Sequence, residues 1–120
     1  MTQTHVQRLD IERGLRALGI SVGDVVEAHA SLSAFGRVRG GADTVVDALT
    51  ATVGERGAVV MSAYRVGPPV FLSDAERARG LTWKVRILPE DHDEKTGMGA
   101  VADAFRRRSD TVTGTGVHRT

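Results

Sequence analysis

The order of apolar segments in the first half of the chain constrains the fold more than any other feature. The segments Val25–Ala30 (VVEAHA) and Gly57–Tyr64 (GAVVMSAY) are short and apolar, which is typical of strands. Between them lies a stretch with apolar residues at helical spacing, namely Val45, Val46, Leu49 and Val53. A helix that joins two strands is the crossover of a strand–helix–strand unit. We therefore predict an α/β fold with a central mixed sheet flanked by helices.

Further elements are predicted on both sides of this unit. Residues 7–18 are predicted to form a helix, because Ile11, Leu15 and Leu18 fall on one face. The remaining predictions are a short helix that starts at Ser73, a strand Thr82–Leu88, a helix Met98–Arg108 and a structural break at Gly67, Pro68 and Pro69. A chain of 120 residues is expected to form a single domain over residues 1–120.

Composition excludes several classes of function. The formal net charge of +1 argues against general nucleic-acid binding, which needs a basic excess. The absence of cysteine excludes disulfides, thiolate zinc sites and cysteine nucleophiles. No apolar run has membrane-spanning length, and the N-terminus carries no signal-peptide pattern, so we expect a cytoplasmic protein without membrane association.

The segment 29–41 (HASLSAFGRVRGG) has the composition of an anion-binding loop. It supplies two serine hydroxyls and the guanidinium groups of Arg37 and Arg39, and its last two glycines precede the predicted helix. A phosphate-bearing cofactor such as a nucleotide or coenzyme A fits this pattern. The loop matches neither the P-loop nor the dinucleotide-binding fingerprint. The alternative is a flexible surface turn with solvated arginines.

Three blocks of the sequence together resemble the aminoglycoside 3-N-acetyltransferase family. They are VEAHASLSAFGRVRGGADTVVDAL from Val26, GAVVMSAY from Gly57 and TGMGAVADAFRRRSD from Thr96, in the order in which the family has them. The resemblance implies an antibiotic-acetyltransferase fold, acetyl coenzyme A as co-substrate and direct acetyl transfer to the 3-amino group of an aminoglycoside or a related amine. It also implies a small-molecule amine as the partner.

The resemblance also implies site residues. Those that the resemblance places at the coenzyme are His29, Ser31, Leu32, Ser33 and Gly36, although His29 could equally have a structural hydrogen-bonding role. The residues themselves add Arg37, whose guanidinium could pair with phosphate oxygens, and Met98 and Gly99, which lie at a helix start where a backbone N–H could face the coenzyme. The alternative for Met98 is a place in the core. Asp91 and Asp93 could attract a polycationic aminoglycoside, or simply form a solvated loop. We expect no metal site, because a lone histidine, His92, in an acidic run is usually solvated. The run from Arg106 to Arg108 could reach the 3′-phosphate of the coenzyme, or end a helix in water.

The sequence departs from the family pattern at Ala30, at Ser62 and in the segment before Met98. Family members are considerably longer, so the chain is expected to be an N-terminal portion, truncated at its C-terminus. The catalytic base is unknown, and His118 is a candidate for it. The alternative function is a truncated, non-catalytic module that binds coenzyme A or a partner.

Overall fold

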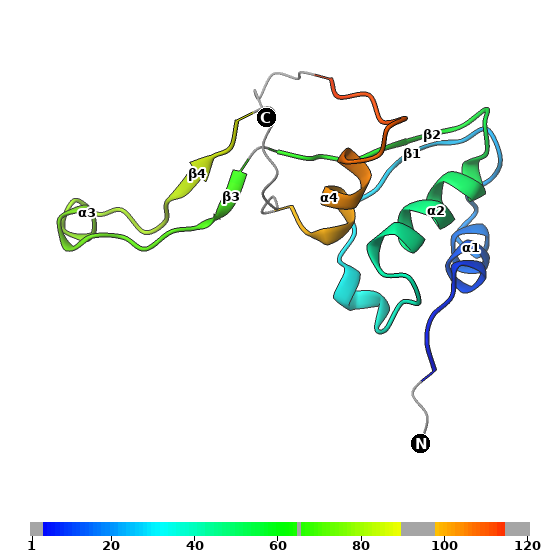
Figure 1. Ribbon diagram of the computed structural model, residues 1–120, viewed down its shortest axis with the longest axis horizontal. Coiled ribbons are helices and arrows are strands. Elements are labelled where there is room, and N and C mark those ends of the chain that lie inside the picture. Colours follow the sequence, from blue (N-terminus) through cyan, green and yellow to red (C-terminus); the bar gives the residue numbers. More distant parts are fainter. Residues whose placement is uncertain (1–3, 65, 90–97, 115–120) are drawn as a thin grey trace.

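The protein is described by a computed structural model over residues 4–64, 66–89 and 98–114. The helices are α1 (Arg8–Ala17), α2 (Ala42–Val53), α3 (Asp74–Ala78) and α4 (Ala100–Arg106), with a 3-10 turn η1 (Leu32–Phe35). The strands are β1 (Val25–Glu27), β2 (Ala58–Val60), β3 (Val66–Pro69) and β4 (Val85–Ile87). Figure 1 shows a body made of α1, α2, α4, β1 and β2, and an arm made of β3, α3 and β4 that projects from it.

The strand–helix–strand unit is present as predicted. β1 and β2 pair in parallel with Val26 opposite Val59, and α2 is the connection between them. Both strands are shorter than the apolar segments that predicted them, because the residues that follow each strand leave the ladder.

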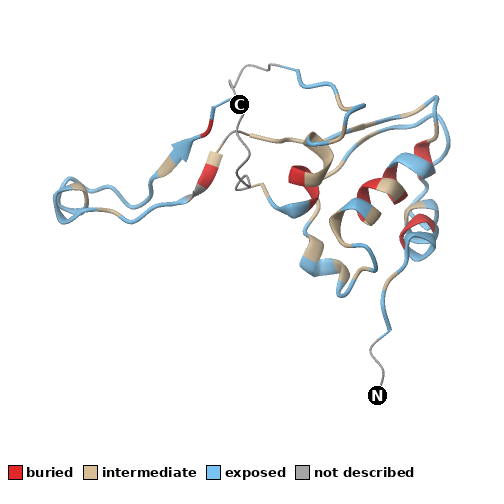
Figure 2. Cartoon of the chain, viewed as in Figure 1, coloured by how far each residue is buried: buried red, intermediate tan, exposed pale blue. Residues whose placement is uncertain are grey.

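Helix α2 is the centre of the core (Figure 2). The core cluster consists of Ile11, Val45, Val46, Ala48, Leu49 and Val101. Of these, Val46 and Ala48 of α2 and Val101 of α4 are completely buried. The predicted apolar face of α2 is therefore confirmed, and α1 and α4 pack against it.

The arm is an antiparallel hairpin with a helix at its tip (Figure 1). The prediction that Gly67, Pro68 and Pro69 break regular structure is wrong, since they lie within β3. In a two-stranded hairpin each strand has a free edge, where a proline removes no ladder hydrogen bond. The register between β3 and β4 is also irregular between Val66 and Pro69.

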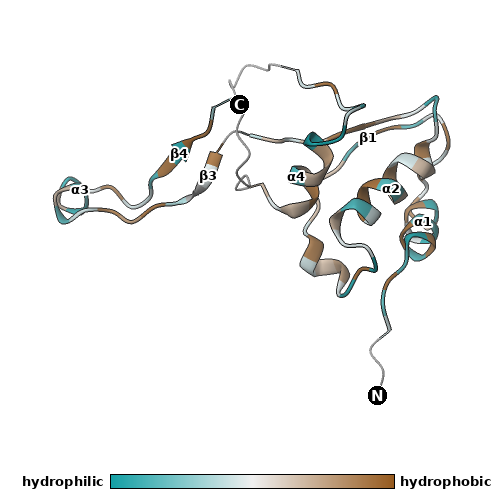
Figure 3. Cartoon of the chain, viewed as in Figure 1, coloured by the Kyte–Doolittle hydropathy of each residue, from teal (hydrophilic) through white to brown (hydrophobic). Residues whose placement is uncertain are grey.

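The predicted α/β class is confirmed in its coarse form. The described residues form two separate two-stranded sheets. Figure 3 shows hydrophobic residues along β4, although this strand is largely exposed in Figure 2 and Ile87 is 70% exposed. Within the described ranges, no helix is long and apolar enough to cross a bilayer.

Candidate functional site

The loop between β1 and α2 is held by the N-terminal segment. The amide of Val6 donates to the carbonyl of Arg37 at 2.7 Å, and the amide of Arg39 donates to the carbonyl of Val6 at 2.9 Å. These bonds form an isolated parallel bridge between Val6 and Val38. The backbone of the loop is therefore fixed where its two arginines lie, which argues against a flexible turn.

A glycine closes the loop onto the start of α2. Gly40 has a φ of 88°, and a methyl group placed on it would lie 2.2 Å from the Oγ1 of Thr44. The Thr44 hydroxyl donates to the carbonyl of Arg39 at 2.7 Å. Any side chain at position 40 would disrupt this contact, so the glycine serves the loop's own closure.

A cavity of about 340 Å³ opens where β1 and β2 end. It is lined by Ala28, His29, Ala30, Ser31, Met61, Ser62, Met98 and Ala102. The segment before α4 completes it, and a methyl group placed on Gly99 would lie 3.9 Å from the carbonyl oxygen of Ala30. The structure therefore brings together the predicted coenzyme residues His29, Ser31 and Met98, which are far apart in the sequence.

Polar side chains lie at the cavity after both strands, namely Ser62 after β2 and His29 and Ser31 after β1. The hydroxyl oxygens of Ser31 and Ser33 lie 3.1 Å apart and share a hydrogen bond. The Nε2 of His29 lies 3.4 Å from the Oε1 of Glu27, and both side chains are more than half exposed. Both pairs remain accessible to a ligand.

Other predicted site residues lie away from the cavity. Leu32 packs against the core, and Gly36 ends η1 with a φ of 76°. The side chains of Arg37 and Arg39 are exposed, and neither forms an ion pair within the described part of the chain. Asp91, Asp93, His92 and His118 are outside the described residues.

The arginines at the end of α4 are engaged within the protein. The Nε atoms of Arg106 and Arg107 each lie 3.0 Å from an oxygen of the buried Asp103. The Nη2 of Arg108 lies 2.6 Å from the Oδ1 of Asp47 on α2. All three guanidinium groups therefore contact acidic side chains of the protein. Neither predicted role of the arginine run, a site for the 3′-phosphate or a helix end in water, describes this arrangement.

Sequence reasoning missed Ser62 and Met61 as cavity residues. In the sequence, Ser62 stands out only as a departure from the family pattern. The signal that identifies both is topological, because ligands in α/β sheets bind at the carboxyl ends of parallel strands. Both residues directly follow β2, as His29 and Ser31 follow β1.

No group of three histidine, cysteine or acidic residues that could hold a metal ion occurs in the part of the chain that the structure describes. The polar side-chain groups that line the cavity are the hydroxyls of Ser31 and Ser62 and the imidazole of His29. Their chemistry is that of hydrogen bonding to a small molecule.

The chain is similar to proteins of one family. The sequence model of the aminoglycoside 3-N-acetyltransferase family matches residues 28–115. Aminoglycoside N(3)-acetyltransferase VII of Streptomyces paromomycinus is 35% identical over 115 residues, which is 89% of this chain and 38% of that protein.

Solved structures agree with this match. The aminoglycoside acetyltransferase AAC(3)-Xa is 34% identical with a TM-score of 0.62, over 87% of this chain and 38% of that one. AAC-VIa bound to sisomicin is 27% identical with a TM-score of 0.60, over 88% of this chain and 41% of that one. The chain thus spans about two fifths of the length of these relatives.

Proposed function

Because the chain belongs to the aminoglycoside 3-N-acetyltransferase family, we propose that it carries the coenzyme-binding residues of an enzyme that acetylates an aminoglycoside. The enzyme would transfer the acetyl group of acetyl coenzyme A to the 3-amino group of the acceptor. The observation that carries this proposal is the cavity at the ends of β1 and β2. His29 and Ser31, which the family resemblance assigns to the coenzyme, meet there with Met98, which precedes α4.

The chemistry of the loop fits a coenzyme with phosphate groups. The hydroxyls of Ser31 and Ser33 can donate to a polar chain or a phosphate oxygen, and they lie beside the cavity. Arg37 and Arg39 lie further along the same loop with exposed guanidinium groups. Arginine recognises phosphate oxygens through paired, charge-assisted hydrogen bonds. We assign the carbonyl and pantetheine end to the cavity and the phosphates to the arginines.

Leu32, Gly36 and Gly99 do not line the cavity, and we propose that they shape its surroundings. Leu32 anchors the loop in the core, and Gly36 turns the chain after η1. Gly99 precedes α4 beside the carbonyl of Ala30, so its backbone borders the coenzyme path.

Acetyl coenzyme A supplies the acetyl group as a thioester. In direct transfer, the acceptor nitrogen attacks the thioester carbon, and the C–S bond breaks so that the coenzyme leaves as its thiolate. The proton that the nitrogen loses ends on this sulfur, which gives the free thiol of the coenzyme. His29 is the one titratable side chain among the described residues that line the cavity. Its neighbour Glu27 orients the imidazole, and the hydroxyl of Ser31 is available to a polar atom of the thioester.

The acceptor is proposed to be an aminoglycoside because AAC-VIa was solved with sisomicin bound. An aminoglycoside is a polycation, so acidic side chains increase its local concentration. Asp91 and Asp93 are our candidates for this role in the sequence.

At the level of the fold, we propose that β1 and β2 belong to the central mixed sheet of an acetyltransferase domain. Residues 1–120 then form one unit of that domain, with the coenzyme loop at 29–41. A cytoplasmic location fits the absence of cysteine.

The test is a calorimetric titration of the purified chain with coenzyme A, followed by an acetylation assay with acetyl coenzyme A and sisomicin. We expect binding, and we expect the Arg37→Ala variant to raise the Kd about tenfold, because a charge-assisted hydrogen bond is removed. The backbone carbonyl of Arg37, which accepts from Val6, is retained in this variant.

The matched control is Arg13→Ala, which removes an exposed arginine from α1 and should leave the Kd unchanged. A folded chain that does not bind coenzyme A would refute the assignment of the loop. Binding without acetylation of sisomicin would restrict the chain to coenzyme binding and refute its activity in isolation.

A further inference from the structure

Ser62 lines the cavity at the ends of β1 and β2 from the side of β2. Glu27 lies opposite Val60 in the ladder, and His29 and Ser62 each follow two residues later. The pairing reaches the residue before His29, because the amide of Ala28 donates to the carbonyl of Val60 at 2.9 Å. His29 and Ser62 therefore border the cavity at the same level of two neighbouring strands.

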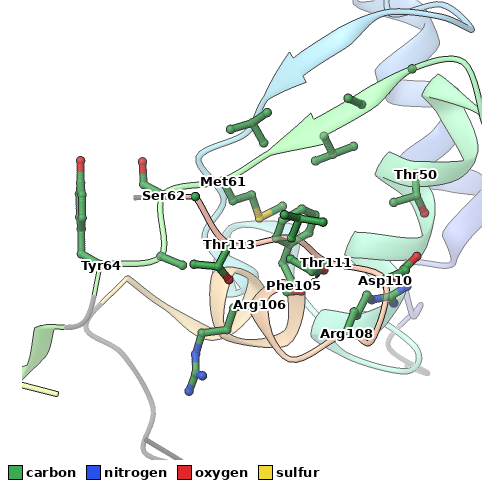
Figure 4. A pocket seen from close by; sticks show the side chains of 17 residues that line it. Thr50, Met61, Ser62, Tyr64, Phe105, Arg106, Arg108, Asp110, Thr111 and Thr113 are labelled. Carbon is green, nitrogen blue, oxygen red and sulfur yellow. Dashed lines mark hydrogen bonds between the residues drawn. The ribbon is translucent and has the colours of Figure 1, made fainter. Parts of the chain in front are cut away.

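The hydroxyl of Ser62 is not engaged within the protein. It forms no hydrogen bond with any other residue in the ranges 4–64, 66–89 and 98–114. Ser62 also borders a second pocket, of about 580 Å³, between β2 and the end of α4 (Figure 4). There Met61 points toward Phe105, and Ser62, one residue later, points the other way. The Ser62 side chain is therefore not packed against α4, and its hydroxyl is available to a ligand.

The second hydroxyl that lines the cavity, that of Ser31, is less suited to a ligand atom inside it. Ser31 is exposed and shares a hydrogen bond with Ser33 at 3.1 Å, in which either hydroxyl can be the donor. A bond from Ser31 to a ligand would compete both with Ser33 and with water. Ser62 is half-buried and has neither competitor among the described residues, so a bond from its hydroxyl contributes more.

The rest of the cavity lining favours a ligand with one strong acceptor. Its remaining side chains are apolar and belong to Ala28, Ala30, Met61, Met98 and Ala102. A hydrogen bond is electrostatically stronger in such surroundings than in water. A thioester matches this lining, because its methyl group and sulfur are weakly polar and its carbonyl oxygen is the strong acceptor.

We propose that the hydroxyl of Ser62 donates a hydrogen bond to the carbonyl oxygen of the bound thioester. Free coenzyme A cannot make this contact, because it has a thiol in place of the acyl group. Ser62 is then the residue by which the site distinguishes the acetylated coenzyme, which is its substrate, from the free coenzyme, which is its product. The inference rests on the proposed function, since it places the thioester in this cavity.

The test compares two ligands that differ at the carbonyl group alone, acetyl coenzyme A and S-ethyl coenzyme A. A methylene replaces the carbonyl in the second ligand, so the size is kept and the acceptor is lost. Calorimetric titration of the chain without an acceptor amine gives both Kd values. We expect the unmodified chain to bind acetyl coenzyme A about fivefold more tightly, which is the effect of one neutral hydrogen bond.

Variants of Ser62 locate this preference. Ser62→Ala should weaken the binding of acetyl coenzyme A about fivefold and leave that of S-ethyl coenzyme A unchanged. Ser62→Thr keeps a hydroxyl and should keep the preference. The matched control is Ser21→Ala, which removes an exposed hydroxyl that lines neither pocket and should change neither Kd. Circular dichroism of each variant establishes that the fold is kept.

Infrared spectroscopy reports on the hydrogen bond itself. The carbonyl stretch of acetyl coenzyme A, identified by an isotope label at the carbonyl carbon, falls in frequency when the oxygen accepts a hydrogen bond. The stretch should therefore lie higher in the Ser62→Ala complex than in the unmodified complex. It should return to the unmodified value in the Ser62→Thr complex.

Equal Kd values of the two ligands in the unmodified chain would overturn the inference and leave the proposed function intact. This comparison needs no variant, so it decides even if a substitution disturbs the fold. A preference that survives Ser62→Ala would also overturn the inference, and one that Ser31→Ala abolishes instead would assign the carbonyl to Ser31. If neither ligand binds the folded chain, the proposed function is refuted and this inference with it.

Discussion

Asp103 neutralises two guanidinium groups from within the core. The residue is 8% exposed, and its two oxygens contact the Nε atoms of Arg106 and Arg107 at 3.0 Å. All three residues lie on one or two turns of α4, so the contacts are local in sequence. The side chains of Asp103 and Arg106 are 11% and 17% exposed, which separates this pair from ordinary surface pairs, which contribute little, whereas the side chain of Arg107 is 38% exposed.

We predict that Asp103→Asn lowers the free energy of unfolding by about 2 kcal/mol, because two charge-assisted hydrogen bonds lose their charged acceptor. Urea unfolding measures the change. The control is Asp74→Asn, where a fully exposed carboxylate lies 3.7 Å from Arg77 and the change should be close to zero. Equal effects of the two substitutions would contradict the role given to burial.

Glu76 makes the tip of the arm sensitive to acid. Its carboxylate accepts from the backbone amide of Ser73, and then from Lys84, and these contacts lower its pKa from 4.5 to about 2. A group with a lowered pKa stabilises the folded state above its unfolded pKa, and this contribution is lost as the pH falls.

We therefore predict that helix α3 keeps constant order above about pH 5 and loses it progressively between pH 4.5 and 2. A carboxyl NMR titration should place the midpoint of Glu76 near 2. Lys84→Ala should raise this midpoint while leaving the Ser73 contact, and Glu76→Gln should abolish the pH dependence. A midpoint near 4.5 in the unmodified chain would contradict the capping contacts.

At the scale of elements, the junction of α2 with the sheet depends on a glycine. A methyl group on Gly57 would lie 2.5 Å from the Cβ of Val53 and 2.6 Å from the carbonyl oxygen of Asp24. Because one of these atoms belongs to the backbone, the contact cannot be relieved by rotating a side chain. Strand β2 would have to move away from both β1 and α2.

We predict that Gly57→Ala destabilises the fold by about 2 kcal/mol through this overpacking. Gly14→Ala is the matched control, since Gly14 lies in the interior of α1 with nothing within 4 Å of the added methyl. That substitution should stabilise the chain by about 0.5–1 kcal/mol, because alanine favours the helix. Thermal unfolding of both variants measures the two changes in stability. A Gly57→Ala variant as stable as the unmodified chain would contradict the tight contacts described at this junction.

Elements with a strong period were predictable from the sequence. The spacing of Val45, Val46 and Leu49 indicates the buried face of α2, and Ser73 with Glu76 three residues later marks the start of α3. These signals are local, since they depend on neighbours within one or two turns. The strand ends were not predictable, because they depend on where a partner strand stops.

The candidate site was predictable in part for the same reason. The serines and arginines of the loop are visible as a cluster in the sequence. The bridge by which Val6 fixes this loop is not visible in the sequence, because it joins residues about thirty positions apart and follows from the tertiary fold. The ion pair between Arg108 and Asp47 also joins residues far apart in the sequence. The sequence of the arginine run therefore does not reveal this partner.

At the scale of the whole molecule, the chain is less compact than a globular domain of its length. The radius of gyration is 17.3 Å, against about 14 Å expected for a compact domain of this size. The arm accounts for the difference, since it projects from the body (Figure 1). Phe71 is 96% exposed and Trp83 is 62% exposed on this arm.

We predict that backbone amides in β3 and β4 exchange with solvent at least about 100-fold faster than those of α2, because an isolated hairpin has little buried surface. Hydrogen exchange followed by mass spectrometry measures the ratio. Equal exchange rates for the amides of the arm and those of α2 would contradict the prediction that the arm is less stable than the body.

The bridge between Val6 and Val38 has a consequence for how the protein is handled and how it responds to its surroundings. The conformation of the loop between β1 and α2 depends on the backbone of Val6, through the carbonyl of Arg37 and the amide of Arg39. Whatever pulls on that segment, such as an affinity tag, a fusion partner or a protease that trims it, acts on the loop as well. The segment around Val6 thus holds the loop in place, and a preparation that lacks this segment would lose both hydrogen bonds.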